Sequence, residues 1–208
     1  MGPPASGKGT HADLLRVHFD LPSASPGAML REEKQAGSAL GLEADRLTSE
    51  GRLVSDEVIN AVVRSWLNRQ SGDGFVFDGY PRTLGQAAAL DEMLFESGML
   101  LEASLLLDAD VATLRQRVEK RITCRACGNT TSLDLLPEGS GECPRCGGEL
   151  SRRSDDTSET LNVRFREYLE KTAPVVGYYE KRHLLHHVKA AGSQNEVFAE
   201  VCRVLDLK

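Results

Sequence analysis

The sequence has no long apolar run, no secretion signal and no excess of basic charge. No stretch of its 208 residues is apolar over the length of a membrane-spanning helix, so we expect no membrane partner. Residues 1–4 show neither the basic region nor the apolar core of a signal peptide, and we expect a cytoplasmic protein. The net charge is −6, the opposite sign to that of most nucleic-acid-binding surfaces, so we expect no nucleic-acid partner.

Low-complexity tracts and internal repeats are also missing. With 40% hydrophobic and 27% charged residues, the composition is that of a globular protein. A chain of this length suits one ordinary domain with a small insert.

Short apolar runs alternate with amphipathic stretches along most of the chain. This alternation predicts an α/β fold, in which helices cover both faces of a parallel sheet. The predicted strands are residues 21–25, 75–77, 103–107 and 184–188. The predicted helices are residues 7–17, 28–35, 40–50, 56–68, 86–96, 111–121, 158–171 and 196–205, with Ser55 and Asp110 as N-caps of two of them.

The helical pattern stops between residues 122 and 152, where Gly, Pro, Thr, Ser and Cys predominate. Two CxxC pairs, fifteen residues apart, lie in this segment. Four thiolates at this spacing are typical of a tetrahedral structural Zn²⁺ site, although the same ligands also suit iron. We therefore predict a small inserted module held by a metal bound to Cys124, Cys127, Cys143 and Cys146.

A glycine-rich segment at the N-terminus matches the phosphate-loop frame GxxxxGK. Its backbone N–H groups and the helix that follows suit a phosphate, and its lysine suits the outer phosphates of a nucleotide. A Gly/Pro-rich tail that matches by chance is the alternative. Only Met1 precedes the loop, so we expect either that a first strand is missing from this chain and lies upstream, or that the loop is poorly anchored. The predicted ATP-binding residues here are Gly2, Pro3, Ala5, Ser6, Gly7, Lys8, Gly9 and Thr10.

This loop ends in GKGT and resembles that of adenylate kinases, a family of nucleoside monophosphate kinases, here of the type with a zinc-binding lid. Further blocks resemble the same family in the same order: residues 53–56, 78–83 with Gln86, 153–156 with Glu159, Thr160 and Arg164, and 172–174 with Tyr178 and Tyr179. The resemblance implies a P-loop NTPase-like core at residues 1–121 and 153–208. It also implies a monophosphate-binding insert at about 25–54 and a lid at 122–152.

The resemblance implies Mg²⁺-dependent phosphoryl transfer from ATP to AMP, giving two ADP, by a monomer. It implies that the lysine and arginines carry the catalysis: Lys8, Arg82, Arg121, Arg153 and Arg164. Arg117 and Arg121, one helical turn apart, would bind ATP from one helix face. Asp78 would orient water around Mg²⁺, and Asp155 and Asp156 would hold the arginines beside the lid. The AMP-binding residues would be Pro26, Arg31, Leu53, Val54, Gly79, Arg82, Gln86, Arg153 and Arg164.

Plainer interpretations of the same residues stay open. The two arginines of residues 111–121 suit a solvated helix face, residues 78–79 a simple turn, and residues 152–156 a surface ion cluster. Pro26 and Ala28 replace a threonine and an aspartate that are usual in the family. An acceptor such as UMP or CMP is therefore an alternative, although Gln86 favours AMP. A zinc-ribbon protein that binds nucleic acid or a protein partner is the alternative from another class.

Overall fold

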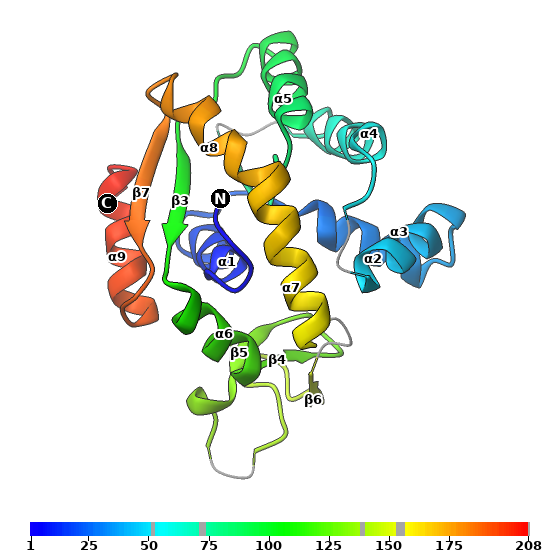
Figure 1. Cartoon of the computed structure of the whole chain (residues 1–208), viewed down its shortest axis with the longest axis vertical. Coiled ribbons are helices and arrows are strands. Elements are labelled where there is room, and N and C mark those ends of the chain that lie inside the picture. Colours follow the sequence, from blue (N-terminus) through cyan, green and yellow to red (C-terminus); the bar gives the residue numbers. More distant parts are fainter. Residues whose placement is uncertain (51–52, 71–73, 138–139, 153–156, 208) are drawn as a thin grey trace.

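The structure, a computed structural model, describes residues 1–50, 53–70, 74–137, 140–152 and 157–207 (Figure 1). The helices are α1 (Lys8–Phe19), α2 (Pro26–Gln35), α3 (Ala39–Ser49), α4 (Asp56–Leu67), α5 (Leu84–Glu96), α6 (Val111–Lys120), η1 (Leu133–Leu135), α7 (Ser158–Glu167), η2 (Tyr168–Thr172), α8 (Ala173–Glu180) and α9 (Gln194–Val204). The strands are β1 (Ser23–Ala24), β2 (Val76–Phe77), β3 (Ser104–Asp108), β4 (Arg121–Cys124), β5 (Thr130–Ser132), β6 (Leu150–Ser151) and β7 (Leu185–Lys189).

Two pairs of parallel strands form the centre of the molecule. β1 lies beside β2, with Ala24 opposite Phe77, and β3 lies beside β7, with Leu107 opposite Val188. The predicted α/β class is confirmed, and a strand lies at each of the four predicted places. The predicted single parallel sheet is not seen in the described residues, because the four parallel strands stay in two separate pairs; β4, β5 and β6 form a third, antiparallel sheet.

Met1 lies along the edge of β3 that faces away from β7. Its amino group donates a hydrogen bond to Leu105 O, and its carbonyl oxygen accepts one from Leu107 N at 3.1 Å. We expected either a missing first strand or a poorly anchored loop, and the residues described before α1 form no strand. The phosphate loop is nevertheless anchored, because Met1 holds its start against β3.

Helices pack on both faces of the β3–β7 pair, as predicted. On one face, Leu107 and Val188 are buried with Leu15 of α1 and Val201 of α9. On the other face, α8 and α5 pack together, and Tyr179 of α8 is fully buried beside the start of β7. Figure 1 shows β3 and β7 between α9 and the run of α7 and α8.

A further apolar cluster joins α2, α3, α4 and α5. Leu30, Val54, Ile59 and Leu90 are buried in it. The helices expected to bind a monophosphate therefore share one core with α5, which begins directly after the loop of residues 78–83.

The helix predicted to end near residue 171 instead continues as η2 and α8. Pro174 did not end it, because this residue lies in the first turn of α8, where its missing N–H group needs no partner. α7, η2 and α8 thus cross the molecule from the small β-sheet to α5 (Figure 1). In the part of the chain that the structure describes, no helix has the length and apolar character that crossing a bilayer requires.

Candidate active site and metal centre

The phosphate loop curls between the end of β3 and α1. Gly2, Ala5 and Gly7 have positive φ angles, of 136°, 64° and 97°. A Cβ on Gly2 would lie 2.8 Å from Leu107 O, so only glycine fits this close approach to β3. The loop residues and the N-terminus of α1 therefore form the concave backbone that the motif predicted.

Lys8 lies inside this loop. Its Nζ atom donates hydrogen bonds to Gly2 O and Pro3 O, both at 2.8 Å, and to Ser6 Oγ at 3.3 Å. Desolvation lowers the pKa of Lys8 from 10.5 to about 7, and the Asp78 carboxylate opposes this shift. Lys8 should therefore bind an anion more favourably than it binds Gly2 O and Pro3 O, because the anion would stabilise the protonated, charged form of its amino group.

Three arginines from distant elements contribute to the same shift. The charges of Arg82, Arg164 and Arg121 each lower the pKa of Lys8, after desolvation. Desolvation and then the charge of Arg164 lower the pKa of Arg82 itself. The charges of these arginines thus reinforce the positive potential at Lys8, which suits a polyanionic ligand.

The loop after β2 carries Asp78 and Arg82. Asp78 N donates to Ala24 O at 2.8 Å, which fixes the start of the loop against β1. Arg82 Nε donates to Gly79 O at 2.7 Å, and a Cβ on Gly79 would lie 2.8 Å from an Arg82 guanidinium nitrogen. Thr172 Oγ1 donates to Arg82 O at 3.0 Å, a contact to which sequence reasoning gave no role.

Nine residues line a cavity beside this loop, and the resemblance assigned six of them to the acceptor: Pro26, Leu53, Val54, Gly79, Arg82 and Gln86. Arg31, also assigned there, lies one turn along α2, and its guanidinium is 3.5 Å from the place of a Cβ on Gly27. The cavity residues come from α2, the segment before α4, α4 itself, the loop and α5: Pro26, Gly27, Leu30, Leu53, Val54, Ile59, Gly79, Arg82 and Gln86.

Gln86 is 2% exposed, and both ends of its amide have protein partners. Its Nε2 donates to Asp56 Oδ1 at 2.8 Å, and its Oε1 accepts from Arg82 N at 2.7 Å. The sequence showed Asp56 only as part of a family-like block, without a role. The available signal was that Asp56 follows the predicted N-cap Ser55 and so lies in the first turn of α4.

Arg117 and Arg121 do not share one helix face, so that prediction is wrong. α6 ends at Lys120, and Arg121 has extended backbone angles and begins β4. Arg117 donates to Ala190 O at 2.5 Å, near the buried ring of His11. Only Arg121 of this pair appears among the causes that lower the pKa of Lys8. Arg153, Asp155 and Asp156 lie outside the described residues.

The cysteine module folds as the antiparallel sheet β5–β4–β6. The four Sγ atoms lie within 4.8 Å of one another, with Cys124 and Cys146 at 3.5 Å and Cys127 and Cys143 at 3.7 Å. On a tetrahedron with metal–sulfur bonds of about 2.3 Å, sulfur atoms lie about 3.8 Å apart. The four thiols therefore fit a tetrahedral metal ion.

The backbone around the cysteines also suits bound sulfur. Cys127 N and Arg145 N approach Sγ atoms at 3.5 and 3.4 Å, as donors that would stabilise thiolates. A Cβ on Gly148 would lie 3.0 Å from Cys124 Sγ, so glycine leaves room for the cluster. These features favour a closed structural site.

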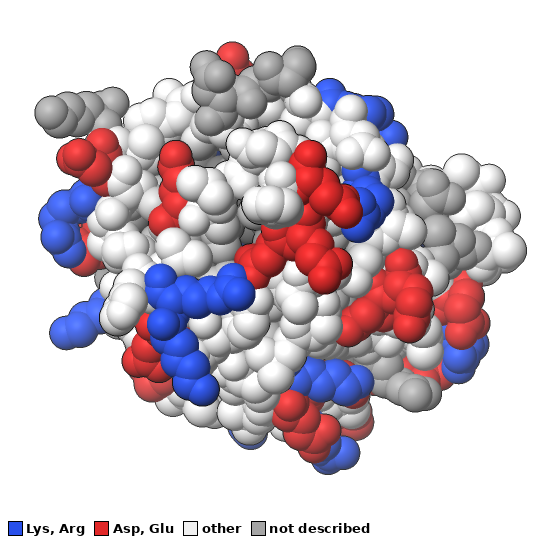
Figure 2. All heavy atoms as spheres, turned by 90° about the horizontal axis from the view of Figure 1, so that it is seen from above, with Lys and Arg blue, Asp and Glu red and all other residues white. Residues whose placement is uncertain are grey.

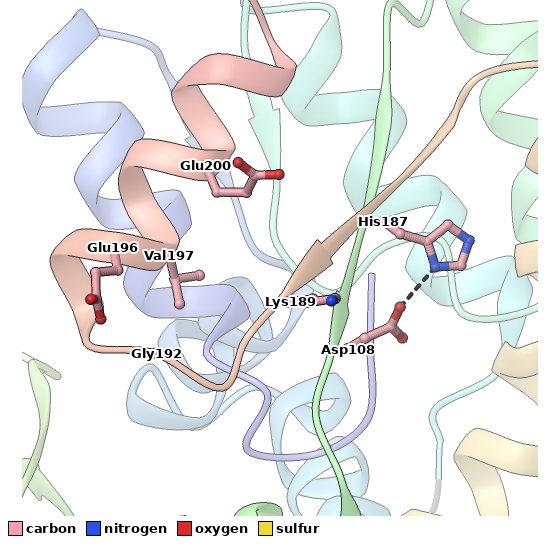
Figure 3. A pocket seen from close by; sticks show the side chains of 7 residues that line it. All are labelled: Asp108, His187, Lys189, Gly192, Glu196, Val197 and Glu200. Carbon is pink, nitrogen blue, oxygen red and sulfur yellow. Dashed lines mark hydrogen bonds and ion pairs between the residues drawn. The ribbon is translucent and has the colours of Figure 1, made fainter.

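A separate open hollow lies between the end of β3, β7 and α9 (Figure 3). His187 Nδ1 lies 2.7 Å from Asp108 Oδ2 there, while Glu196 and Glu200 project from α9. Three carboxylates and one lysine, Lys189, line it. Such a charge balance disfavours a polyphosphate ligand in this hollow.

The face drawn in Figure 2 carries charged side chains of both signs. Figure 2 shows the face above α5 and α8, on which Lys and Arg side chains are interspersed with Asp and Glu. Among the described residues drawn there, the basic side chains form no continuous surface, which an interface with phosphate backbones would require.

Comparisons with known proteins agree with the geometry. The model of the family described as adenylate kinase matches residues 1–184. An adenylate kinase of Syntrophomonas wolfei is 38% identical over 208 residues, which cover 99% of this chain and 97% of that protein. An adenylate kinase of Thermodesulfovibrio yellowstonii is 39% identical, covering 100% and 98%. One of Salinispora tropica is 41% identical over 199 residues, covering 95% and 92%.

Proposed function

This chain belongs to the adenylate kinase family and transfers a phosphoryl group from ATP to AMP, and we propose that Lys8 and the arginines around it perform the transfer. The feature that carries this proposal is the burial of Lys8 within the phosphate loop, where the charges of Arg82, Arg121 and Arg164 all act on it. The attacking oxygen of a monophosphate is already anionic, so the reaction needs alignment and cationic charge more than a base.

We assign the donor to the phosphate loop. Backbone N–H groups of residues 2–10 would bind the ATP phosphates, and Lys8 would leave Gly2 O and Pro3 O to contact them. Arg121 supports this assignment through its effect on Lys8. Arg117 would lie at the edge of the donor site, held by Ala190 O.

We assign the acceptor to the cavity beside α2 and α5. Arg31 and Arg82 would bind the AMP phosphate, and Gln86 would contact the base. Arg153 and Arg164 would contact the transferring group from the side of the small sheet. Planar guanidinium groups suit this task, because each can bind two phosphate oxygens at once.

Adenylate kinases use Mg²⁺ with ATP, and Asp78 is the residue that we propose to hold its water ligands. Its carboxylate lies beside Gly9, at the N-terminus of α1, and opposes the pKa shift of Lys8. When bound, Mg²⁺ neutralises phosphate charge. Asp78 would orient the water ligands of Mg²⁺, while Lys8 and the arginines would contact the phosphates.

We propose that Zn²⁺ is the metal held by the four cysteines and that residues 122–152 act as a lid. Residues 1–121 and 153–208 would form the core, with the monophosphate-binding insert at about 25–54. A small sheet with little apolar content gains its folding energy from the metal. Closure of a rigid lid excludes water, so hydrolysis does not compete with transfer.

One chain supplies every residue assigned above, and we propose a monomer that acts on the ATP and AMP of the cytoplasm. The relatives favour AMP over the alternatives of another monophosphate or a zinc-ribbon binding protein. A coupled assay with ATP, Mg²⁺ and AMP, CMP, UMP or GMP tests this. AMP should be consumed fastest, with two ADP formed per AMP. Consumption of none of them would contradict the proposal.

A further inference from the structure

The amide of Gln86 is held in one orientation by two partners of opposite type. Asp56 Oδ1 can only accept a hydrogen bond, and it receives one from Gln86 Nε2 at 2.8 Å. Arg82 N can only donate, and it donates to Gln86 Oε1 at 2.7 Å. A 180° flip of the amide would put oxygen against a carboxylate and NH₂ against an N–H group, losing both bonds in a buried place.

Asp56 is itself held in position. Thr83 Oγ1 donates to Asp56 Oδ2 at 2.5 Å. Gly85 leaves room for the carboxylate, since a Cβ there would lie 3.0 Å from the same oxygen. Both residues belong to the start of α5, whereas Asp56 begins α4, so the contact joins two helices at the cavity.

The amide keeps one N–H hydrogen and one oxygen lone pair free of these two contacts. Gln86 lines the cavity that we assign to the acceptor. A donor beside an acceptor, in a fixed order, complements a base that presents a ring nitrogen acceptor beside an amino group. Adenine and cytosine present this pair, whereas hypoxanthine, guanine and uracil present N–H beside a carbonyl group.

We propose that Asp56 is a positioning residue that fixes the Gln86 amide, so that the acceptor site selects amino bases over keto bases. This inference rests on the proposed role of the cavity. Without the Asp56 carboxylate, the Gln86 amide would flip more easily, and the site would then accept both amino bases and keto bases. Discrimination by buried hydrogen-bonding groups is strong, because the wrong base leaves them unpaired.

The test compares AMP with inosine 5′-monophosphate (IMP). IMP has a carbonyl group in place of the 6-amino group of AMP and a hydrogen on the neighbouring ring nitrogen, and it is otherwise the same. Wild-type kcat/KM should favour AMP over IMP by about 100-fold or more. In Asp56→Asn, a carbonyl oxygen that stays on Thr83 turns NH₂ towards Gln86 Nε2, so residue 56 no longer opposes the flip and Arg82 N alone holds the amide. The AMP/IMP ratio should then fall by about tenfold or more, mainly through KM. CMP and UMP repeat the comparison on a pyrimidine.

Glu57→Gln is the matched control, because it removes an exposed carboxylate from the same helical turn. Its AMP/IMP ratio should equal that of the wild type. An unchanged ratio in folded Asp56→Asn, or a parallel loss for both substrates, would overturn the inference while the kinase activity stands. Equal use of AMP and IMP by the wild type would overturn it even if the variant does not fold. Failure of the wild type on every monophosphate would instead reject the proposed function.

Discussion

The carboxylate of Asp78 lies close to where a side chain on Gly9 would begin: Asp78 Oδ2 is 3.2 Å from the position of a Cβ at residue 9. Many phosphate loops carry Ser or Thr directly after the lysine, to contact Mg²⁺. Here the β2 loop brings a carboxylate to that place. Glycine in the motif therefore reflects the approach of Asp78 to the N-terminus of α1.

Asp78→Asn should lower turnover by about 10- to 100-fold and raise the Mg²⁺ concentration needed for half-maximal rate, because an amide orients metal-bound water less well. Initial rates over a Mg²⁺ titration measure both effects. Asp13→Asn removes an exposed carboxylate from α1 and should leave both values unchanged. An unaltered Mg²⁺ dependence in Asp78→Asn would contradict the assigned role.

The lowered pKa of Lys8 predicts that activity falls and that the stability of the free protein rises as pH increases. With a pKa of about 7, ligand-free Lys8 loses its charge as pH rises, so kcat/KM for ATP should fall above about pH 7. The unfolded chain keeps this proton up to about pH 10.5, so it binds more protons than the folded protein between those values. Lys8 should therefore make the free protein more stable as pH rises through this window.

Lys8→Met separates these effects from those of other groups. The variant should lose activity by orders of magnitude, and its melting temperature should match or exceed that of the wild type at pH 7, because it buries no charge. The difference in melting temperature should shrink towards pH 10. A wild-type kcat/KM for ATP that stays constant from pH 6 to 9 would contradict the assignment.

Arg82→Ala should lower kcat/KM for AMP by about 10³-fold or more, because it removes a cation that we assign to the AMP phosphate. Arg82→Lys should recover part of this loss, since a lysine restores charge without the planar fork. Arg115→Ala, at an exposed position on α6, is the control and should behave as the wild type. Steady-state kinetics with varied AMP and varied ATP tests the series. A loss confined to ATP binding would contradict the assignment of Arg82 to the acceptor.

Cys143→Ser should lower the bound metal below one ion per chain and reduce the melting temperature by several degrees. Elemental analysis and thermal unfolding measure these, and elemental analysis of the wild type distinguishes zinc from iron. Cys202→Ser, in α9, should retain the metal. If Cys143→Ser lost turnover while metal content and melting temperature stayed the same, the structural role would be refuted.

The sequence predicts this site well wherever a ligand requires residues at a fixed spacing along the chain. The phosphate loop and the four cysteines are local patterns, so their residues came together as expected. The ends of the helices predicted at residues 111–121 and 158–171 were misplaced, because helix ends depend on local backbone geometry that periodicity does not show. The bond from Asp56 to Gln86 spans 30 positions, and no local pattern encodes it.

The central claim is that Lys8 and the arginines enclose the phosphates of both nucleotides. A crystal structure with a bisubstrate compound, two adenosines joined by five phosphates, tests it most directly. Lys8, Arg31, Arg82, Arg121, Arg153 and Arg164 should each lie within hydrogen-bonding distance of a phosphate oxygen. A complex in which Lys8 still contacts Gly2 O and Pro3 O, with the guanidinium groups turned away from the phosphates, would contradict it.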